Sequence, residues 1–133
     1  SGWLKRRAWI LNIMIADTIK SKSDNSLTAL LAFSEKLAQS KEKLVEALEI
    51  MQTWFRDLLV FPLSPDKIIN QDKIHDLERV AQHLDMNTTL SYFEAIQTAL
   101  DRIDGNANPR LMLDVTLMTF LGFNHEKDRR YPV

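Results

Sequence analysis

The sequence contains no cysteine and only three glycines in 133 residues. The lack of cysteine excludes a disulfide framework and a thiolate metal site, and it suits a cytoplasmic protein. The shortage of glycine disfavours a β-sheet protein, because tight strand turns draw on that residue. The longest apolar run, near residues 8–16, is interrupted by Asn12 and is too short to span a bilayer. No cleavage site of a signal peptide accompanies it.

An excess of one charge is also missing. The chain has 17 basic and 18 acidic residues and a net charge of −1, whereas a general nucleic-acid surface needs clustered Lys and Arg. Two short basic clusters are present, Lys5-Arg6-Arg7 and residues 127–130. We interpret both as solvated flanks. They leave one alternative open, a DNA-contacting helical adaptor module that acts through residues 5–7 and 127–130.

Catalytic constellations are missing as well. The sequence has no Gly-rich phosphate loop and no Gly-x-Ser-x-Gly elbow. His75, His83 and His125 show no metal-ligand spacing, and we interpret them as solvated or capping residues. We therefore predict no catalytic residue, no cofactor, no metal and no small-molecule substrate.

Helical periodicity runs from one end of the chain to the other. It predicts helices over residues 3–20, 27–39, 41–60 and 72–84, from the 85–89 region to 103, and over 109–121. Start signals support several of them: Ser40, Asp72, and Asn108 followed by Pro109. The fold class is all-α, a single helical bundle of five to six helices.

Two helices carry more apolar surface than one core face needs. In the first helix, Leu4, Leu11 and Ile15 belong to the expected inward stripe, whereas Ile10 and Met14 fall outside it. The last helix is apolar around nearly its whole circumference. Aromatic residues and Met are enriched at interfaces, so we expect contacts with a partner, with burial inside the domain as the alternative. The candidate interface residues are Trp3, Trp9, Ile13, Met118 and Phe120.

Three motifs, in order and with consistent spacing, resemble a known family. They are Trp54-Phe-Arg-Asp-Leu-Leu59, Ile68-Ile-Asn-Gln-Asp72 and Asn106-Ala-Asn-Pro-Arg-Leu-Met-Leu-Asp114. The stretch from Leu27 to Phe123 resembles the C-terminal collar domain of delta-prime subunits of bacterial DNA polymerase III clamp loaders. The gamma/tau subunit has a related collar, so the identity of the subunit stays open. Asp114 stands where the family usually has Glu.

The resemblance implies an assembly (oligomerisation) domain. Collar domains of this family join into a five-membered ring that holds an ATP-driven clamp loader together while it loads the sliding clamp onto primed DNA. The expected partners are the gamma/tau and delta subunits, with DNA contacted only through the whole complex, and no membrane. Residues 1–26 would be a helix and linker leading from an ATPase region, 27–123 the helical collar, and 124–133 a polar tail. The start at Ser1-Gly2, without Met, also predicts a piece of a longer protein.

The motif residues have simpler structural explanations too. We expect Trp54 in the core, Asn108 and Pro109 as a helix cap, and Arg56 and Asp57 paired either within the domain or across the ring. Arg110 sits at a helix N-terminus, which is unfavourable for its charge, so a carboxylate partner is expected, with Asp57 and Asp114 as candidates. The full set of predicted motif residues is Trp54, Arg56, Asp57, Asn106, Asn108, Pro109, Arg110 and Asp114.

Overall fold

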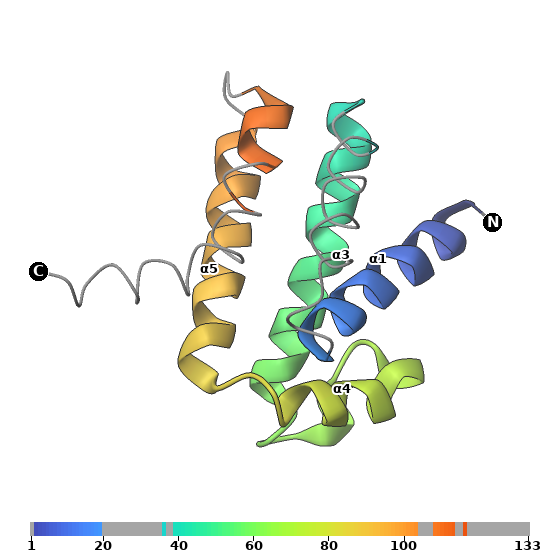
Figure 1. Ribbon diagram of the computed structural model, residues 1–133, viewed down its shortest axis with the longest axis vertical. Helices are drawn as coiled ribbons and strands as arrows, with labels where there is room; N and C mark the ends of the chain where they lie inside the picture. The colour runs from blue at the N-terminus through green and yellow to red at the C-terminus, as the bar shows by residue number, and fades with distance from the viewer. Residues whose placement is uncertain (1, 20–35, 37–38, 104–107, 114–115, 117–133) are drawn as a thin grey trace, which may run out of the picture.

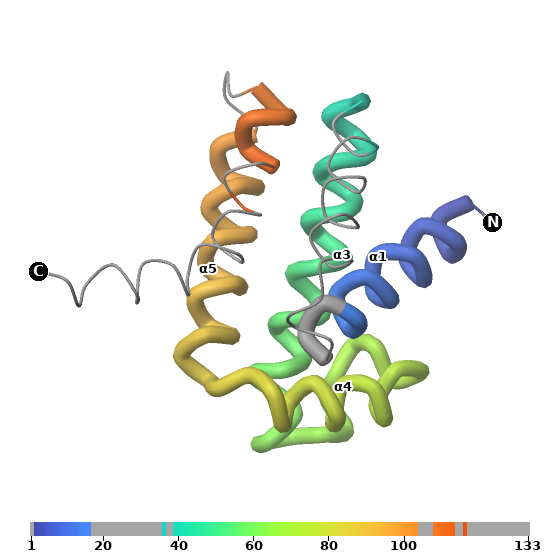
Figure 2. Tube along the Cα trace, in the orientation of Figure 1, coloured from blue at the N-terminus to red at the C-terminus, as the bar shows by residue number. Residues whose placement is uncertain are grey.

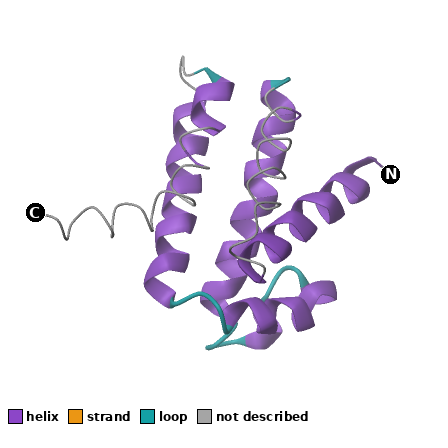
Figure 3. Ribbon diagram, viewed as in Figure 1, coloured by secondary structure: helices purple, strands orange, loops and turns teal. Residues whose placement is uncertain are grey.

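The computed structural model describes residues 2–19, 36, 39–103, 108–113 and 116. Its described residues form helices and connecting turns with no strand, which confirms the all-α prediction (Figure 3). The helix predicted over 27–39 lies almost entirely outside the described residues. So do several predicted site residues and the tail: Asn106, Asp114, Met118, Phe120, His125 and residues 124–133.

The bundle is organised around one central helix, α3 (Lys41–Val60). Helix α5 (Met86–Ile103) runs antiparallel beside it, and α1 (Gly2–Ile19) crosses it at an angle (Figure 1). The short helix α4 (Ile74–Ala81) lies across the end of the bundle where α3 stops, and it contacts both α1 and α3. None of the described helices combines the length and apolar character needed to cross a bilayer.

Local chemistry sets where the helices begin. The predicted range of α3 is confirmed, and the hydroxyl of Ser40 accepts a hydrogen bond from the Lys43 amide at 3.1 Å. Asp85 precedes α5, and its carboxylate accepts from the Thr88 amide at 2.7 Å. Such caps satisfy amides that have no partner within the helix.

One predicted cap is wrong. Asp72 does not start α4, because it lies inside a 3-10 turn, η2 (Gln71–Lys73), and the residue before Ile74 is Lys73, without a side-chain cap. A second 3-10 turn, η1 (Pro65–Lys67), follows the proline-rich end of α3. The carboxylate of Asp72 instead binds Arg7 of α1, a residue far away in the sequence.

The core forms where α1, α4 and α5 pack against α3. Trp54, expected in the core, is fully buried on the inward face of α3. In α4, Leu77 and Val80 lie three residues apart on one face and are fully buried. In α5, helical spacing predicts an inward face that includes Leu90, Ile96 and Ile103. Ile96 and Ile103 are buried, whereas Leu90 is 43% exposed, and Thr89 and Ala99 complete the buried stripe.

The buried face of α1 differs more strongly from the inward stripe that the sequence predicts. Ile10 and Met14, expected outside the stripe, are 1% and 4% exposed, whereas Leu4, expected inside, is 57% exposed. Leu4 therefore lies on a face of α1 that no described helix covers, and α1 crosses the bundle with its N-terminus at the outer edge (Figure 2). The buried stripe follows residues 10, 11, 14 and 15, which also have helical spacing.

Candidate functional site

A fully buried carboxylate lies in the last turns of α3. Asp57 is 0% exposed and accepts hydrogen bonds from the Ile69 amide (2.8 Å), the Asn70 amide (2.8 Å) and the Asn70 side-chain amide (2.7 Å). The Arg56 guanidinium donates to the same carboxylate at 3.2 Å and to the Lys67 carbonyl at 3.1 Å. A buried charge is tolerated when such donors replace water. Asp57 therefore fixes the loop after α3 onto that helix.

The same loop is tied to α1 through Arg7. The Arg7 guanidinium donates to both Asp72 oxygens, at 2.9 and 2.7 Å, and to the side-chain oxygen of Asn70 at 2.7 Å. The hydrogen bond from Arg7 holds the pKa of the Asp72 carboxyl below its usual range, and Asp72 in turn raises the pKa of Arg7. We refer to Arg7, Arg56, Asp57, Asn70 and Asp72 as the Asp57 network. It joins α1, α3 and the 61–73 loop into one unit.

The Asp57 network is structural rather than catalytic. The oxygens of Asp57 are occupied by donors, and the residue has no exposed surface from which to reach a substrate. No group of three metal-ligating side chains occurs in the part of the chain that the structure describes. His75 is exposed, and the Nδ1 atom of His83 lies 3.0 Å from the Arg79 carbonyl near the end of α4, in the capping role expected of it.

The structure separates the motif residues into two places. Arg56 and Asp57 pair with each other in the Asp57 network, beside the buried Trp54. Asn108 caps the helical residues 109–113, because its side-chain oxygen accepts from the Arg110 amide at 2.8 Å and from the Leu111 amide at 3.3 Å. The half-buried Pro109 occupies the first helical position, as predicted. This cap is at the opposite end of α3 from Asp57.

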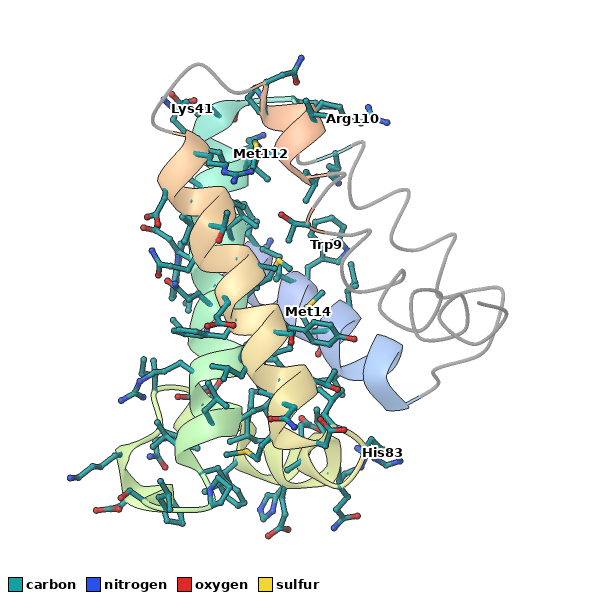
Figure 4. The ribbon with its side chains drawn as sticks, turned by 90° about the vertical axis from the view of Figure 1, so that its left-hand side faces the viewer. Trp9, Met14, Lys41, His83, Arg110 and Met112 are labelled. Carbon is teal, nitrogen blue, oxygen red and sulfur yellow. The ribbon has the colours of Figure 1, made fainter. Side chains whose placement is uncertain are left out.

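The position of Arg110 excludes one of its expected partners. Figure 4 shows Arg110 at the same upper end of the bundle as Lys41, where α3 begins, whereas Asp57 belongs to the last turns of that helix. The Asp57 carboxylate is also occupied by its own loop. Asp57 is therefore not the partner of Arg110, and the other candidate, Asp114, lies outside the described residues.

Two members of the Asp57 network do not follow from the sequence reasoning. The sequence places Arg7 in a solvated basic cluster, and it marks Asn70 only as part of a turn motif. A signal for Arg7 exists, because it lies three and four residues before the buried Ile10 and Leu11 and so shares their face of α1. A cation on a buried stripe indicates a specific partner.

The candidate interface residues on α1 have different environments. Trp3 is 45% exposed and Trp9 is 37% exposed, whereas Ile13 is half-buried and packs against the core. Neighbouring Leu4 adds to the exposed apolar surface of this helix. Large apolar side chains in such positions are typical of a surface that meets a partner.

The basic cluster at residues 5–7 is largely neutralised within the domain. Arg6 forms an ion pair with Glu46 of α3, with its second nitrogen 3.1 Å from the other carboxylate oxygen, and this contact lowers the pKa of Glu46. Arg7 is held by Asp72. Only Lys5 of the three remains unpaired among the described residues, and the cluster at 127–130 lies outside them. Residues 5–7 are therefore poorly suited to binding DNA phosphates.

Comparison with known proteins identifies a family. Residues 3–121 match the family model described as DNA polymerase III, delta subunit, C terminal. The matched range includes α1, upstream of the Leu27 at which the motif resemblance starts, and it includes the whole Asp57 network. No curated protein and no solved structure matches the chain.

Proposed function

The chain belongs to the family of C-terminal domains of the DNA polymerase III delta subunit, and we propose that it is the collar domain of a delta-prime subunit. The family makes it a domain of a DNA polymerase III clamp-loader subunit, a non-catalytic accessory part. In our proposal it holds the gamma/tau and delta subunits in the pentameric ring that loads the sliding clamp onto primed DNA. The domain contacts DNA only through the whole complex, in the cytoplasm.

The exposed apolar surface carries the proposal. Large apolar side chains stand out from several elements, and their exposed fractions range from 37% to 83%. They are Trp3, Leu4, Trp9, Leu63, Ile69, Met86, Leu90 and Leu111. A domain that builds a ring needs contact surfaces on more than one side, because each member touches two neighbours. We propose that Trp3 and Leu4 on α1 form one such surface.

The Asp57 network supports this role by fixing the geometry. A ring closes only if each domain presents its two contact surfaces at a constant angle. Arg7, Asp57 and Asn70 bind α1 to the end of α3 through charge-assisted hydrogen bonds, which restrict the orientation of α1. In our proposal the network therefore sets the angle at which α1 meets a neighbour.

Co-elution on a sizing column tests the proposal. We expect this chain, mixed with gamma/tau and delta subunits, to elute as a complex, and failure to co-elute under any condition would count against assembly. The double variant Trp3→Ser, Leu4→Ser should weaken the complex by more than tenfold, since buried tryptophans at interfaces are worth about 2 kcal/mol or more. The double variant Met86→Ser, Leu90→Ser on α5 also replaces two exposed apolar side chains (50% and 43% exposed) and is the control for a general loss of apolar surface. Equal behaviour of both variants would exclude α1 as the contact.

The identity of the subunit has its own measurement. In our proposal the delta-prime subunit fills a single position of the five-membered ring, and gamma/tau subunits fill more than one. Native mass spectrometry of the reconstituted complex counts them. More than one copy of this chain per ring would assign it to gamma/tau.

The alternative of a DNA-contacting adaptor has less support, because Arg6 and Arg7 are committed to carboxylates. A duplex titration at several salt concentrations separates the two functions. Binding that weakens steeply with salt would favour phosphate contacts.

A further inference from the structure

A small hollow with an unusual lining lies between α1, Lys36 and the start of α3. Its volume is about 230 Å³. Four cations surround an apolar floor: Lys5, Arg6, Lys36 and Lys43 around Trp9 and Ile10. Figure 4 shows Trp9 on the side of α1 that faces the upper part of the bundle. We call this hollow the basic pocket.

Most of the charge in the basic pocket is uncompensated. Glu46 also lines it, but that carboxylate is bound by Arg6. Lys5, Lys36 and Lys43 form no ion pair with any described residue. Lys5, Lys36 and Lys43 thus place positive charge around one point of a chain whose net charge is −1, and Glu46 compensates only part of it. This concentration favours an anionic partner.

The aromatic floor adds a second recognition element. Trp9 is 37% exposed, and the Lys36 ammonium stands 5.5 Å from the centre of its ring, within cation–π range. Apolar surface dominates the lining beneath the charges. At about 230 Å³ the pocket is smaller than typical small-molecule sites of ~300–1,000 Å³. It suits one large side chain rather than a cofactor.

The surroundings exclude a long polyanion. A second hollow adjoins the basic pocket across the Arg6–Glu46 pair and is lined by Trp3, Glu42, Glu46 and Glu49, among others. These carboxylates would repel the phosphates of a nucleic-acid strand that continued along α1. The positive surface is therefore short, and it ends in negative charge on the α3 side.

We propose that the basic pocket binds a short acidic peptide segment of a partner protein that carries one large apolar side chain. The apolar side chain lies against the exposed part of Trp9, and flanking carboxylates pair with Lys5, Lys36 and Lys43. This contact is separate from ring assembly, because Trp9 and Trp3 line different hollows.

Fluorescence anisotropy on this chain alone tests the proposal. The probe is a fluorescein-labelled peptide Glu-Asp-Glu-Phe-Asp-Glu at 0.15 M salt. Two control peptides separate the parts of the recognition: one with Ser in place of Phe, and one with Gln and Asn in place of the acids. Both controls should bind at least fivefold more weakly than the probe. No binding of the probe up to millimolar concentration would overturn the proposal.

Matched variants locate the site. Lys43→Glu reverses a charge in the pocket, and it also creates a capping pair with Ser40 at the start of helix α3, so we expect this variant to fold. Lys41→Glu makes the same charge change two residues away, in the lining of the second hollow that adjoins the basic pocket. We expect Lys43→Glu to weaken binding roughly 2- to 30-fold, since an exposed ion pair is replaced by a repulsion, and Lys41→Glu to have little effect.

Two outcomes would refute this site. Equal weakening by Lys41→Glu and Lys43→Glu would show general electrostatic attraction instead of a pocket. Tighter binding of single-stranded hexathymidylate than of the peptide would identify a nucleic acid as the ligand. Neither outcome bears on ring assembly, because no other clamp-loader subunit is present in the experiment.

Discussion

Replacing Asp57 with asparagine tests whether one buried carboxylate holds the 61–73 loop against α3. The two Asp57 oxygens face different donors: Oδ1 accepts from Ile69 and Arg56, and Oδ2 accepts from the amide and side chain of Asn70. An asparagine keeps one oxygen and turns an NH₂ group towards the other pair of donors. Whichever way the amide is oriented, two donors lose the oxygen that accepted from them and face the NH₂ group of the asparagine, which is itself a donor.

The expected loss in the free energy of unfolding follows from these contacts. Hydrogen bonds to a charged group contribute about 1.5–3 kcal/mol each, and an unsatisfied buried donor costs about 1–3 kcal/mol. Arg56 is partly exposed and regains water, so its lost bond counts little. The Ile69 amide is held on the loop and cannot move away without breaking the neighbouring Asn70 contact. We expect Asp57→Asn to lower the free energy of unfolding by about 3–5 kcal/mol, a large part of the ~5–15 kcal/mol of a typical domain.

Urea denaturation followed by circular dichroism measures this change. Asp66→Asn is the matched control, since it makes the same substitution on an exposed residue of the same loop, and it should change stability by less than about 0.5 kcal/mol. A loss below about 1 kcal/mol for Asp57→Asn would refute the reasoning, because it would mean that the loop holds its position without the carboxylate.

Two further predictions concern Asp72, which pairs with Arg7, and Asn108, which caps residues 109–113. Because Arg7 lowers the pKa of Asp72, Asp72 stabilises the fold above its unfolded pKa of about 4, and the contribution is lost as pH falls through the lower folded pKa. The Asp72 side chain is 59% exposed, so Asp72→Asn should lower the free energy of unfolding by no more than about 1 kcal/mol at pH 6. This cost should shrink as the pH is lowered below about 4, and a cost that does not depend on pH would contradict the reasoning. Asn108→Ala removes the cap of residues 109–113 and should cost about 0.5–2 kcal/mol, with Asn108→Asp largely retaining it; equal losses in the two variants, measured by thermal denaturation, would exclude capping as the role of this residue.

Much of the framework was predictable because its causes are local. The range of α3, its Ser40 cap and the Asn108-Pro109 start depend on residues within one helical turn of each other. The core face of α4 follows from one unambiguous stripe. The motif that contains Arg56 and Asp57 was also visible, although whether these residues pair within the domain or across the ring was not.

The Asp57 network could be assembled only by the tertiary structure. Asp57 and Asn70 are 13 residues apart, and Arg7 and Asp72 are 65 apart, so no local spacing joins them. Asp72 is an example. Its position in the sequence predicts a helix cap, but the packing of α1 brings Arg7 near it, and the Arg7 guanidinium binds its carboxylate.

The sequence by itself determined that the described part of the chain is helical, where α1, α3 and α5 start and stop, and which of its motifs resemble those of clamp-loader subunits. Periodicity and capping are properties of a few neighbouring residues, so they can be read without a fold. Only the tertiary structure decided which face of α1 is buried. The sequence of α1 is apolar on several sides. Its packing against α3 and α4 buries Ile10 and Met14 and leaves Leu4 exposed. That choice also exposes Trp3 and Trp9, on which both proposed interactions depend.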